Sequence, residues 1–362
     1  MIKILLIIAA ILILVIFLLG YRTHTLFSVL RGSFRKRVDN FNKVNAILFP
    51  IIMVAGMGLL FWTYGDFSLK FLPESASVHG LETDKLFWGT TVVTVIAWLF
   101  LNILLFAFPY LYQYKEGKRA YFFPDHHKLE IFWTVATTIM LVIMAFYGLK
   151  TWAKVMMDPP DDPVIVEIMG KQFAWKVRYP GPDGKLGKYD FRLIDETNES
   201  GIDFTDKASL DDFSPREIHL PKGKPVMFMI RSRDVLHSVY APHFRVKMDA
   251  VPGMPTRFYF TPRTTTQEMR DNLNDPDFKY ELACAELCGK GHFAMRYLIY
   301  VDEEEDYYKW LSEQKSWLSK HPEYLEKVPE NLRQFVKDVE SLPDEALALE
   351  KARGDDSENE EE

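Results

Sequence analysis

The residue types with the clearest metal-binding chemistry are gathered in one short segment near the end of the chain. The only two cysteines, Cys284 and Cys288, are four residues apart, and His292 and Met295 follow them. Soft sulfur donors select copper, zinc or iron–sulfur clusters, and a thioether beside His and Cys favours copper, because zinc sites rarely use Met. From spacing alone, a disulfide, a zinc site and a pair of buried thiols remain alternatives, since paired cysteines outside the cytoplasm are usually oxidised.

Four apolar segments, 2–19, 46–65, 88–114 and 131–149, approach or exceed the roughly 20 residues that cross a bilayer. The first resembles the apolar region of a signal peptide, but it lacks a small-x-small cleavage motif, so we expect it to stay as a span. The remainder of the chain has the composition of a soluble domain. The sequence therefore predicts a multi-pass membrane protein.

Loop charge predicts the orientation of these spans. The loops 22–43 and 115–128 are basic, whereas the loop 66–85 is acidic on balance. Because basic loops stay in the cytoplasm, the domain after residue 150 is expected on the outer, periplasmic side of a bacterial inner membrane. No basic stretch on the polar part is interleaved with aromatic residues, which argues against nucleic-acid binding.

The part after residue 150 is expected to be a β-sandwich behind the proline-rich linker 159–163. Short β-type runs, separated by Pro, Gly and Asp turns, cover 164–168, 173–179, 217–220, 226–231, 257–261 and 295–301. The polar, irregular segment 183–214 is interpreted as a surface excursion. Residues 306–349 have a helical pattern, expected to form a solvated amphipathic appendage or an acidic docking surface.

Acidic residues concentrate at the C-terminal end of the chain. Residues 302–362 carry 20 acids against 8 bases, while the whole chain has a net charge of −7. The remainder is therefore slightly basic. The residues 354–362 are nearly all polar or acidic and are expected to be disordered.

His237 lies about fifty residues before the cysteines, at the end of a strand-like run. A sandwich can bring the end of one strand beside the loop of another. With this histidine, the C-x-x-x-C-x-x-x-H-x-x-M segment resembles the metal site of cytochrome c oxidase subunit II, in the haem–copper oxidase family. The resemblance spans about residues 86–310 and includes the run 247–253.

The resemblance implies a cupredoxin-like β-sandwich that holds the binuclear copper centre CuA. Cys284 and Cys288 would bridge both coppers, while His237 and His292 would each bind one. The implied weak ligands are the Met295 thioether and the backbone carbonyl of Glu286. The Glu286 side chain also resembles the family's ligand to a magnesium ion at the subunit I interface.

Three further positions acquire roles only through the resemblance. Glu130, at the start of the fourth span, would lie at the mouth of a proton path into subunit I; most carboxylates at such boundaries are simply interfacial. Family members commonly have a Trp at the position of Phe173, where electrons arrive from cytochrome c. This chain keeps only Trp175 there, and either aromatic could also be a packing residue.

The implied fold is a membrane-anchored all-β protein, with N-terminal transmembrane helices, the sandwich and a helical acidic C-terminal tail. The expected divisions are an extra membrane region at 1–85, a two-span hairpin at 86–150, the CuA domain at 160–302 and the tail at 303–362. The family commonly has two spans, so the first two would contact other subunits.

The implied function is electron transfer within a respiratory oxidase, from a c-type cytochrome to haem in subunit I, where oxygen reduction is coupled to proton translocation. The chain itself would hold no oxygen-reducing site. It has no C-x-x-C-H motif, so no covalent haem c is expected. The alternatives are a quinol oxidase subunit, which lacks the copper ligands, a nitrous oxide reductase, which needs a further histidine-rich domain, and a membrane-anchored copper carrier.

Overall fold

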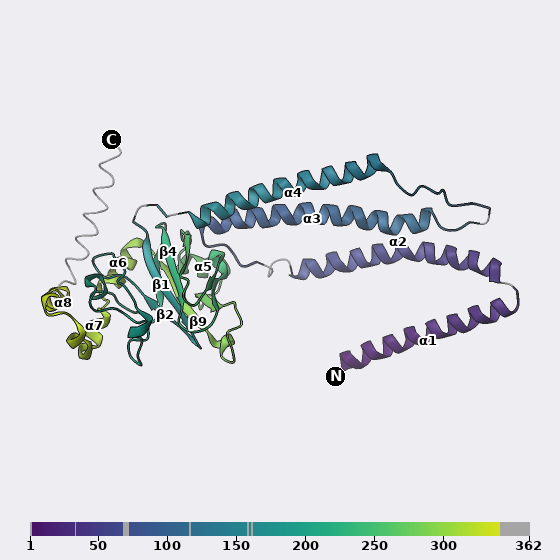
Figure 1. The fold of residues 1–362 in the computed structure, drawn as a ribbon. Helices are drawn as coiled ribbons and strands as arrows, with labels where there is room; N and C mark the ends of the chain where they lie inside the picture. The colour runs from purple at the N-terminus through teal and green to yellow at the C-terminus, as the bar shows by residue number, and fades with distance from the viewer. Residues whose placement is uncertain are drawn as a thin grey trace. The chain divides into compact units, whose positions relative to one another are not determined.

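The computed structural model describes residues 2–32, 34–67, 72–115, 117–157, 159–160 and 162–340, and Figure 1 shows its fold. It divides into two compact units. One comprises residues 1–72 and 89–139, and the other comprises residues 73–88 and 140–362. The residues 354–362, expected to be disordered, lie outside the described ranges.

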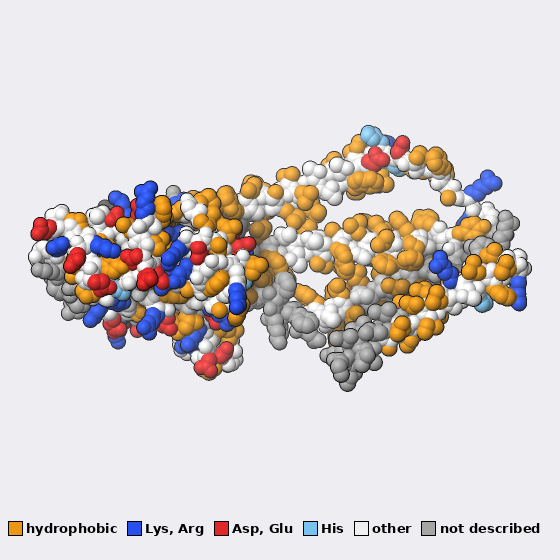
Figure 2. All heavy atoms as spheres, turned by 60° about the horizontal axis from the view of Figure 1, so that its bottom comes forward, with side chains coloured by type: hydrophobic (Ala, Val, Ile, Leu, Met, Phe, Trp, Pro, Cys, Tyr) orange, Lys and Arg blue, Asp and Glu red, His pale blue; other side chains and the backbone are white. Residues whose placement is uncertain are grey.

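Four long apolar helices confirm the predicted spans. They are α1 (Ile2–Leu30), α2 (Phe34–Phe67), α3 (Val78–Leu111) and α4 (His127–Met156). Each contains a stretch long and apolar enough to cross a membrane. On the face drawn in Figure 2, hydrophobic side chains predominate over these helices and charged side chains over the rest of the molecule.

The β-sandwich is built from two sheets. Its strands are β1 (Val164–Lys171), β2 (Ala174–Arg178), β3 (Ile218–Pro221), β4 (Val226–Ser232), β5 (His237–Ala241), β6 (Val246–Ala250), β7 (Thr256–Phe260), β8 (Tyr280–Cys284) and β9 (Arg296–Asp302). One sheet has the order β2-β1-β4-β7 and the other β3-β9-β8-β5-β6. The pairs β1–β4 and β3–β9 are parallel, and the remaining pairs are antiparallel. The predicted sandwich is confirmed.

Alternation along β4 shows how the sequence specifies the core between the sheets. Val226, Phe228 and Ile230 are buried in the main hydrophobic cluster, as the two-residue period of a strand requires. The opposite face of the same sheet is also covered, because β1 is buried along most of its length. Strand β1 therefore lies inside the domain.

A buried ion network lies on that second face. Arg178 donates to both oxygens of Glu167 at 2.9 and 3.0 Å and to Asp212 at 2.8 Å, and Arg231 also pairs with Glu167 at 2.9 Å. Burial alone would raise the pKa of Glu167, but the two guanidinium groups outweigh it and lower the pKa to about 2. The network ties three strands to the segment 183–214.

The segment 183–214 and the C-terminal helices differ from the expectation of a surface excursion and a solvated appendage. Helices α6 (Glu304–Ser312), α7 (Trp317–Lys320) and α8 (Arg333–Glu340) follow β9. Ile202, Phe204 and Leu210 of the segment form a second hydrophobic cluster with Trp317, Leu318, Tyr324, Val328 and Val336. Irregular spacing of these apolar residues hid this core from a periodicity analysis.

The first turns of α3 belong to the same compact unit as the sandwich. Arg245 forms a two-pronged ion pair with Asp84 at 2.7 and 2.9 Å, and Ser77 donates to the carbonyl of Phe244 at 2.7 Å. Lys154 of α4 pairs with Glu82 at 2.7 Å. These contacts fix the start of α3 against the sandwich.

Candidate metal centre

Strand pairing explains why His237 lies beside the cysteines despite the distance in sequence. His237 begins β5 and Cys284 ends β8, and these strands are antiparallel neighbours with Val239 opposite Cys284. The start of one antiparallel strand lies beside the end of its neighbour. The sandwich therefore brings the histidine to the loop that carries the cysteines.

Residues 284–295, here called the metal loop, are held at both ends by the backbone. The amide of Cys284 donates to the carbonyl of Met295 at 3.1 Å, and the amide of Ala285 donates to the carbonyl of Ser238 at 3.0 Å. A 3₁₀ turn at His292–Ala294 then leads into β9. These bonds close the loop and return Met295 to the cysteines.

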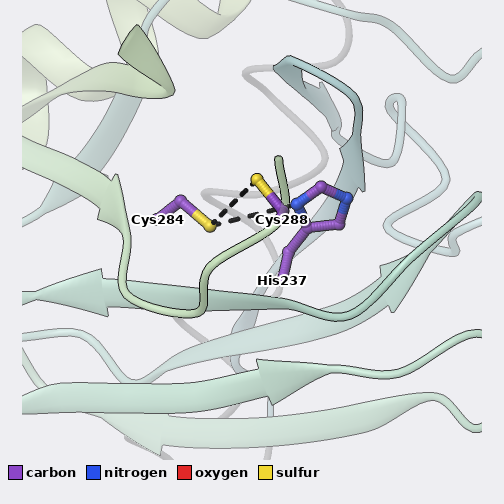
Figure 3. A group of neighbouring side chains, drawn as sticks. All are labelled: His237, Cys284 and Cys288. Carbon is purple, nitrogen blue, oxygen red and sulfur yellow. Dashed lines mark hydrogen bonds between the residues drawn. The ribbon is translucent and has the colours of Figure 1, made fainter. Parts of the chain in front are cut away.

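Three side chains point toward one another at the centre of this loop, as Figure 3 shows. The ligand atoms of His237, Cys284 and Cys288 all lie within 4.8 Å of one another. The Cys284 Sγ is 3.9 Å from Nδ1 of His237 and 4.0 Å from the Cys288 Sγ. These three donors could bind a single ion or two adjacent ions.

The other predicted ligands surround the same two sulfur atoms. Nδ1 of His292 is 3.7 Å and Sδ of Met295 is 3.4 Å from the Cys288 Sγ. The carbonyl oxygen of Glu286 is 3.2 Å from the Cys284 Sγ, while the Glu286 side chain belongs to an exposed residue. All six sequence-predicted positions therefore meet in one place.

The two cysteines are free thiols, too far apart for the disulfide that their spacing allowed. Their sulfur atoms are separated by 4.0 Å, about twice the length of an S–S bond. Burial, and then the neighbouring Cys284, raise the pKa of the Cys288 thiol to about 11. A metal cation reverses this effect, since it holds coordinating thiols as thiolates. Two thiols, two imidazoles and a thioether fit copper by their donor chemistry.

Two residues that the sequence analysis missed hold the metal loop and His237 together. Asp234 accepts hydrogen bonds from Nε2 of His237 at 2.9 Å and from the amides of Gln172 and Val235, each at 2.7 Å. The Gln172 side chain donates to the carbonyl of Cys288 at 2.7 Å. Burial would raise the pKa of Asp234, but the hydrogen bonds from Gln172, His237 and Val235 lower it.

The hydrogen bond from His237 to Asp234 orients the histidine ring. With Nε2 bonded to a carboxylate, Nδ1 of His237 is the ring nitrogen left to face the sulfur atoms. The signal in the sequence was an Asp three residues before a ligand His. The partnership with Gln172, 62 positions away, could not be read from the sequence.

The two predicted electron-entry residues occupy different environments. Trp175 is buried, with its ring centroid 5.9 Å from that of His237 and its Nε1 donating to the Met295 carbonyl at 3.4 Å. Phe173 is 40% exposed, and its ring lies against the metal loop, where Cβ atoms on Gly289 or Gly291 would overlap it. Of these two residues, Phe173 is the one that reaches both solvent and the loop, and Phe293 of the loop itself is 80% exposed.

Glu130 is not brought together with the metal residues. It lies in the first turn of α4, in the other compact unit, with its carboxylate 3.8 Å from Nδ1 of His127.

Comparison with known proteins identifies the family of this chain. The family model for the periplasmic domain of cytochrome c oxidase subunit II matches residues 164–301, and that for its transmembrane domain matches residues 67–151. The alternative cytochrome c oxidase subunit 2 of Bradyrhizobium diazoefficiens is 40% identical over 233 residues, covering 64% of this chain and 78% of that protein. The chain belongs to the cytochrome c oxidase subunit II family.

Two further members of the subunit II family have lower sequence identity to this chain. The subunit 2 of Cereibacter sphaeroides is 26% identical over 256 residues, covering 67% of this chain and 78% of that protein. A crystal structure of the periplasmic domain of subunit II from Bradyrhizobium japonicum is 25% identical, covering 43% of this chain and 94% of that one, with a TM-score of 0.30. The family's transmembrane match begins at residue 67 rather than at residue 86, so it includes the turns of α3 that contact the sandwich.

As a subunit II, the chain is a membrane component of an oxidoreductase complex that contains other oxidase subunits. The cupredoxin-like sandwich carries a His–Cys–Cys cluster consistent with a copper site.

Proposed function

We propose that the site is a binuclear CuA centre through which the chain accepts electrons from a c-type cytochrome and passes them to haem in subunit I. The observation that carries the proposal is the meeting of six donor positions around two unlinked sulfur atoms. A mononuclear copper-carrier site would need fewer ligands. A quinol oxidase subunit would need none of them.

Each donor has a place in this proposal. The Cys284 and Cys288 thiolates would bridge two coppers, and His237 and His292 would complete the strong ligands. Met295 and the carbonyl of Glu286 would be weak ligands. A thiolate-bridged copper pair supplies a one-electron carrier whose geometry changes little between oxidation states.

The protein's contribution is a rigid, pre-formed donor set. The sandwich fixes both ends of the metal loop, and Asp234 and Gln172 orient His237 and Cys288 through hydrogen bonds. Low reorganisation in such a frame favours fast electron transfer at a small driving force. The Phe173 ring offers the donor cytochrome an exposed contact on the metal loop, and Trp175 is buried beside His237.

Three further assignments belong to the same proposal. The sandwich domain lies on the periplasmic side of a bacterial inner membrane, where a soluble cytochrome reaches it. Glu130 assists proton uptake on the cytoplasmic side, and the exposed Glu286 side chain binds magnesium at the subunit I interface. Slowed proton uptake in Glu130→Gln, with electron transfer from copper to haem preserved, would support the role of Glu130. Unchanged uptake kinetics would contradict that role.

Replacement of one bridging ligand tests the function directly. Membranes that carry Cys288→Ser should lose cytochrome c oxidation while the haem spectra of the complex remain. Met254→Leu, which changes an exposed methionine outside the metal loop, serves as the control and should retain activity. Full cytochrome c oxidation by Cys288→Ser membranes would refute the proposed route.

A further inference from the structure

A cavity in the sandwich unit is lined by residues outside the metal centre. Its volume is about 450 Å³, and it lies where the approach to β3 meets the end of α6 and the end of α7. Trp310 and Lys320, which help to line it, follow residue 301, where the family's domain match ends. The cavity is thus made jointly by the family domain and the C-terminal helices of this chain.

One wall of this cavity is a fixed aromatic stack. The His219 ring lies between those of Tyr300 and Trp310, with centroid separations of 5.1 and 4.4 Å, and both pairs are stacked. Asp302 holds Nδ1 of His219 at 2.6 Å. A wall fixed by stacking and a hydrogen bond is pre-organised for a ligand, because little side-chain entropy is left to lose.

Two cations and one acid line the cavity, so its lining carries a net positive charge. Arg216 and Lys320 are both exposed residues at its edge, and among the described residues neither has a carboxylate within salt-bridge distance. Burial lowers the pKa of Lys320, and the positive charges of Arg216 and Lys315 lower it further. The single acid in the lining, Glu217, lies 4.0 Å from Nε2 of His219.

We propose that this cavity binds a small phosphate-bearing anion. An arginine fork and a lysine ammonium are the side chains best suited to phosphate oxygens. The Ser214 hydroxyl and the Gln314 side chain, which also line the cavity, add neutral hydrogen-bonding groups. The volume lies within the range of small-molecule sites and exceeds what a single phosphate ion fills, so a polyphosphate or an organic phosphate is the matching ligand class.

Equilibrium dialysis of the assembled oxidase in detergent at low ionic strength tests this site, with pyrophosphate and ADP as the probes. Saturable binding of at least one probe, with one site per chain, is expected. Arg216→Gln and Lys320→Gln should each weaken binding about tenfold or more, because each removes a charge-assisted hydrogen bond. Lys185→Gln removes an exposed lysine outside the cavity lining and should leave affinity unchanged.

Unchanged haem and copper spectra would show that the variants are assembled. Absence of saturable binding, or binding insensitive to both cavity substitutions, would overturn the proposal. The chain's own acidic residues after position 340 are a competing occupant, which a variant that ends at residue 340 tests. Binding that appears only in that shortened variant would also overturn the proposal, because the occupant would then be the chain's own terminus.

Discussion

Replacement of Asp234 by Asn probes how the protein holds the metal loop. The carboxylate accepts three hydrogen bonds: Oδ1 from Nε2 of His237 and the amide of Val235, and Oδ2 from the amide of Gln172. Asparagine has nearly the same shape but a single oxygen acceptor. Its NH₂ group must therefore face a donor N–H on one side.

The loss can be estimated from this geometry. If the oxygen keeps the two bonds at Oδ1, the bond from the Gln172 amide is lost and the others become neutral. One charge-assisted hydrogen bond contributes about 1.5–3 kcal/mol, which corresponds to roughly 10- to 100-fold in an equilibrium constant. Loss of an outer-shell partner of a metal-bound histidine typically costs a similar factor in metal affinity.

Copper competition against a chelator, on the full-length chain in detergent, measures this effect. Asp234→Asn should bind copper about 10- to 100-fold more weakly, with a shifted visible spectrum that reports a reoriented His237. The control is Asp275→Asn, an aspartate that accepts a backbone hydrogen bond from Asp277 outside the site. Copper affinity and spectrum equal to those of the unmodified chain would refute an orienting role for Asp234.

Three other substitutions test separate parts of the structure. A Cβ at Gly170 would lie 2.7 Å from Cδ2 of His237. Gly170→Ala should therefore displace His237 and lower the copper content, and overpacking should destabilise the domain by about 1–3 kcal/mol. Gly148→Ala, which has open space around it, should change neither. Arg178→Met removes one partner from each of the buried carboxylates Glu167 and Asp212. The free energy of unfolding, measured by chemical denaturation, should fall by about 3–5 kcal/mol. Burial and a nearby aspartate raise the pKa of Asp211 from 3.8 to about 7, so the folded state holds a proton that the unfolded state releases between these values. This contribution to stability is lost as the pH rises toward 7, and Asp211→Asn should therefore stabilise the protein at pH 8 more than at pH 4 in parallel melts.

The membrane helices and the central strands could be predicted because their apolar residues follow simple patterns. Uninterrupted apolar runs predicted α1 to α4, and alternation in Val226–Ser232 predicted β4. The run 88–114 placed the start of the third span ten residues late. The polar residues Glu82 and Asp84 looked like loop, but they pair with Lys154 and Arg245.

Strands β5, β6 and β8 were not predicted, although they carry or flank the site. Each has five residues, and polar or ligand residues replace the apolar alternation. A short strand whose end places His237 or Cys284 at the site has too few apolar residues left for a recognisable alternation. The residues that meet at the site could be predicted from the spacing and the family resemblance, whereas the contacts of Asp234 and Gln172 depend on strand pairing.

The electronic state of the copper tests the central claim most directly. The measurement is an electron paramagnetic resonance spectrum of the purified, copper-loaded protein, recorded with its visible spectrum and copper content. We predict two coppers per chain and a signal from one unpaired electron shared between two copper nuclei. A signal from a single isolated copper, or a Cys284–Cys288 disulfide without bound copper, would contradict the account.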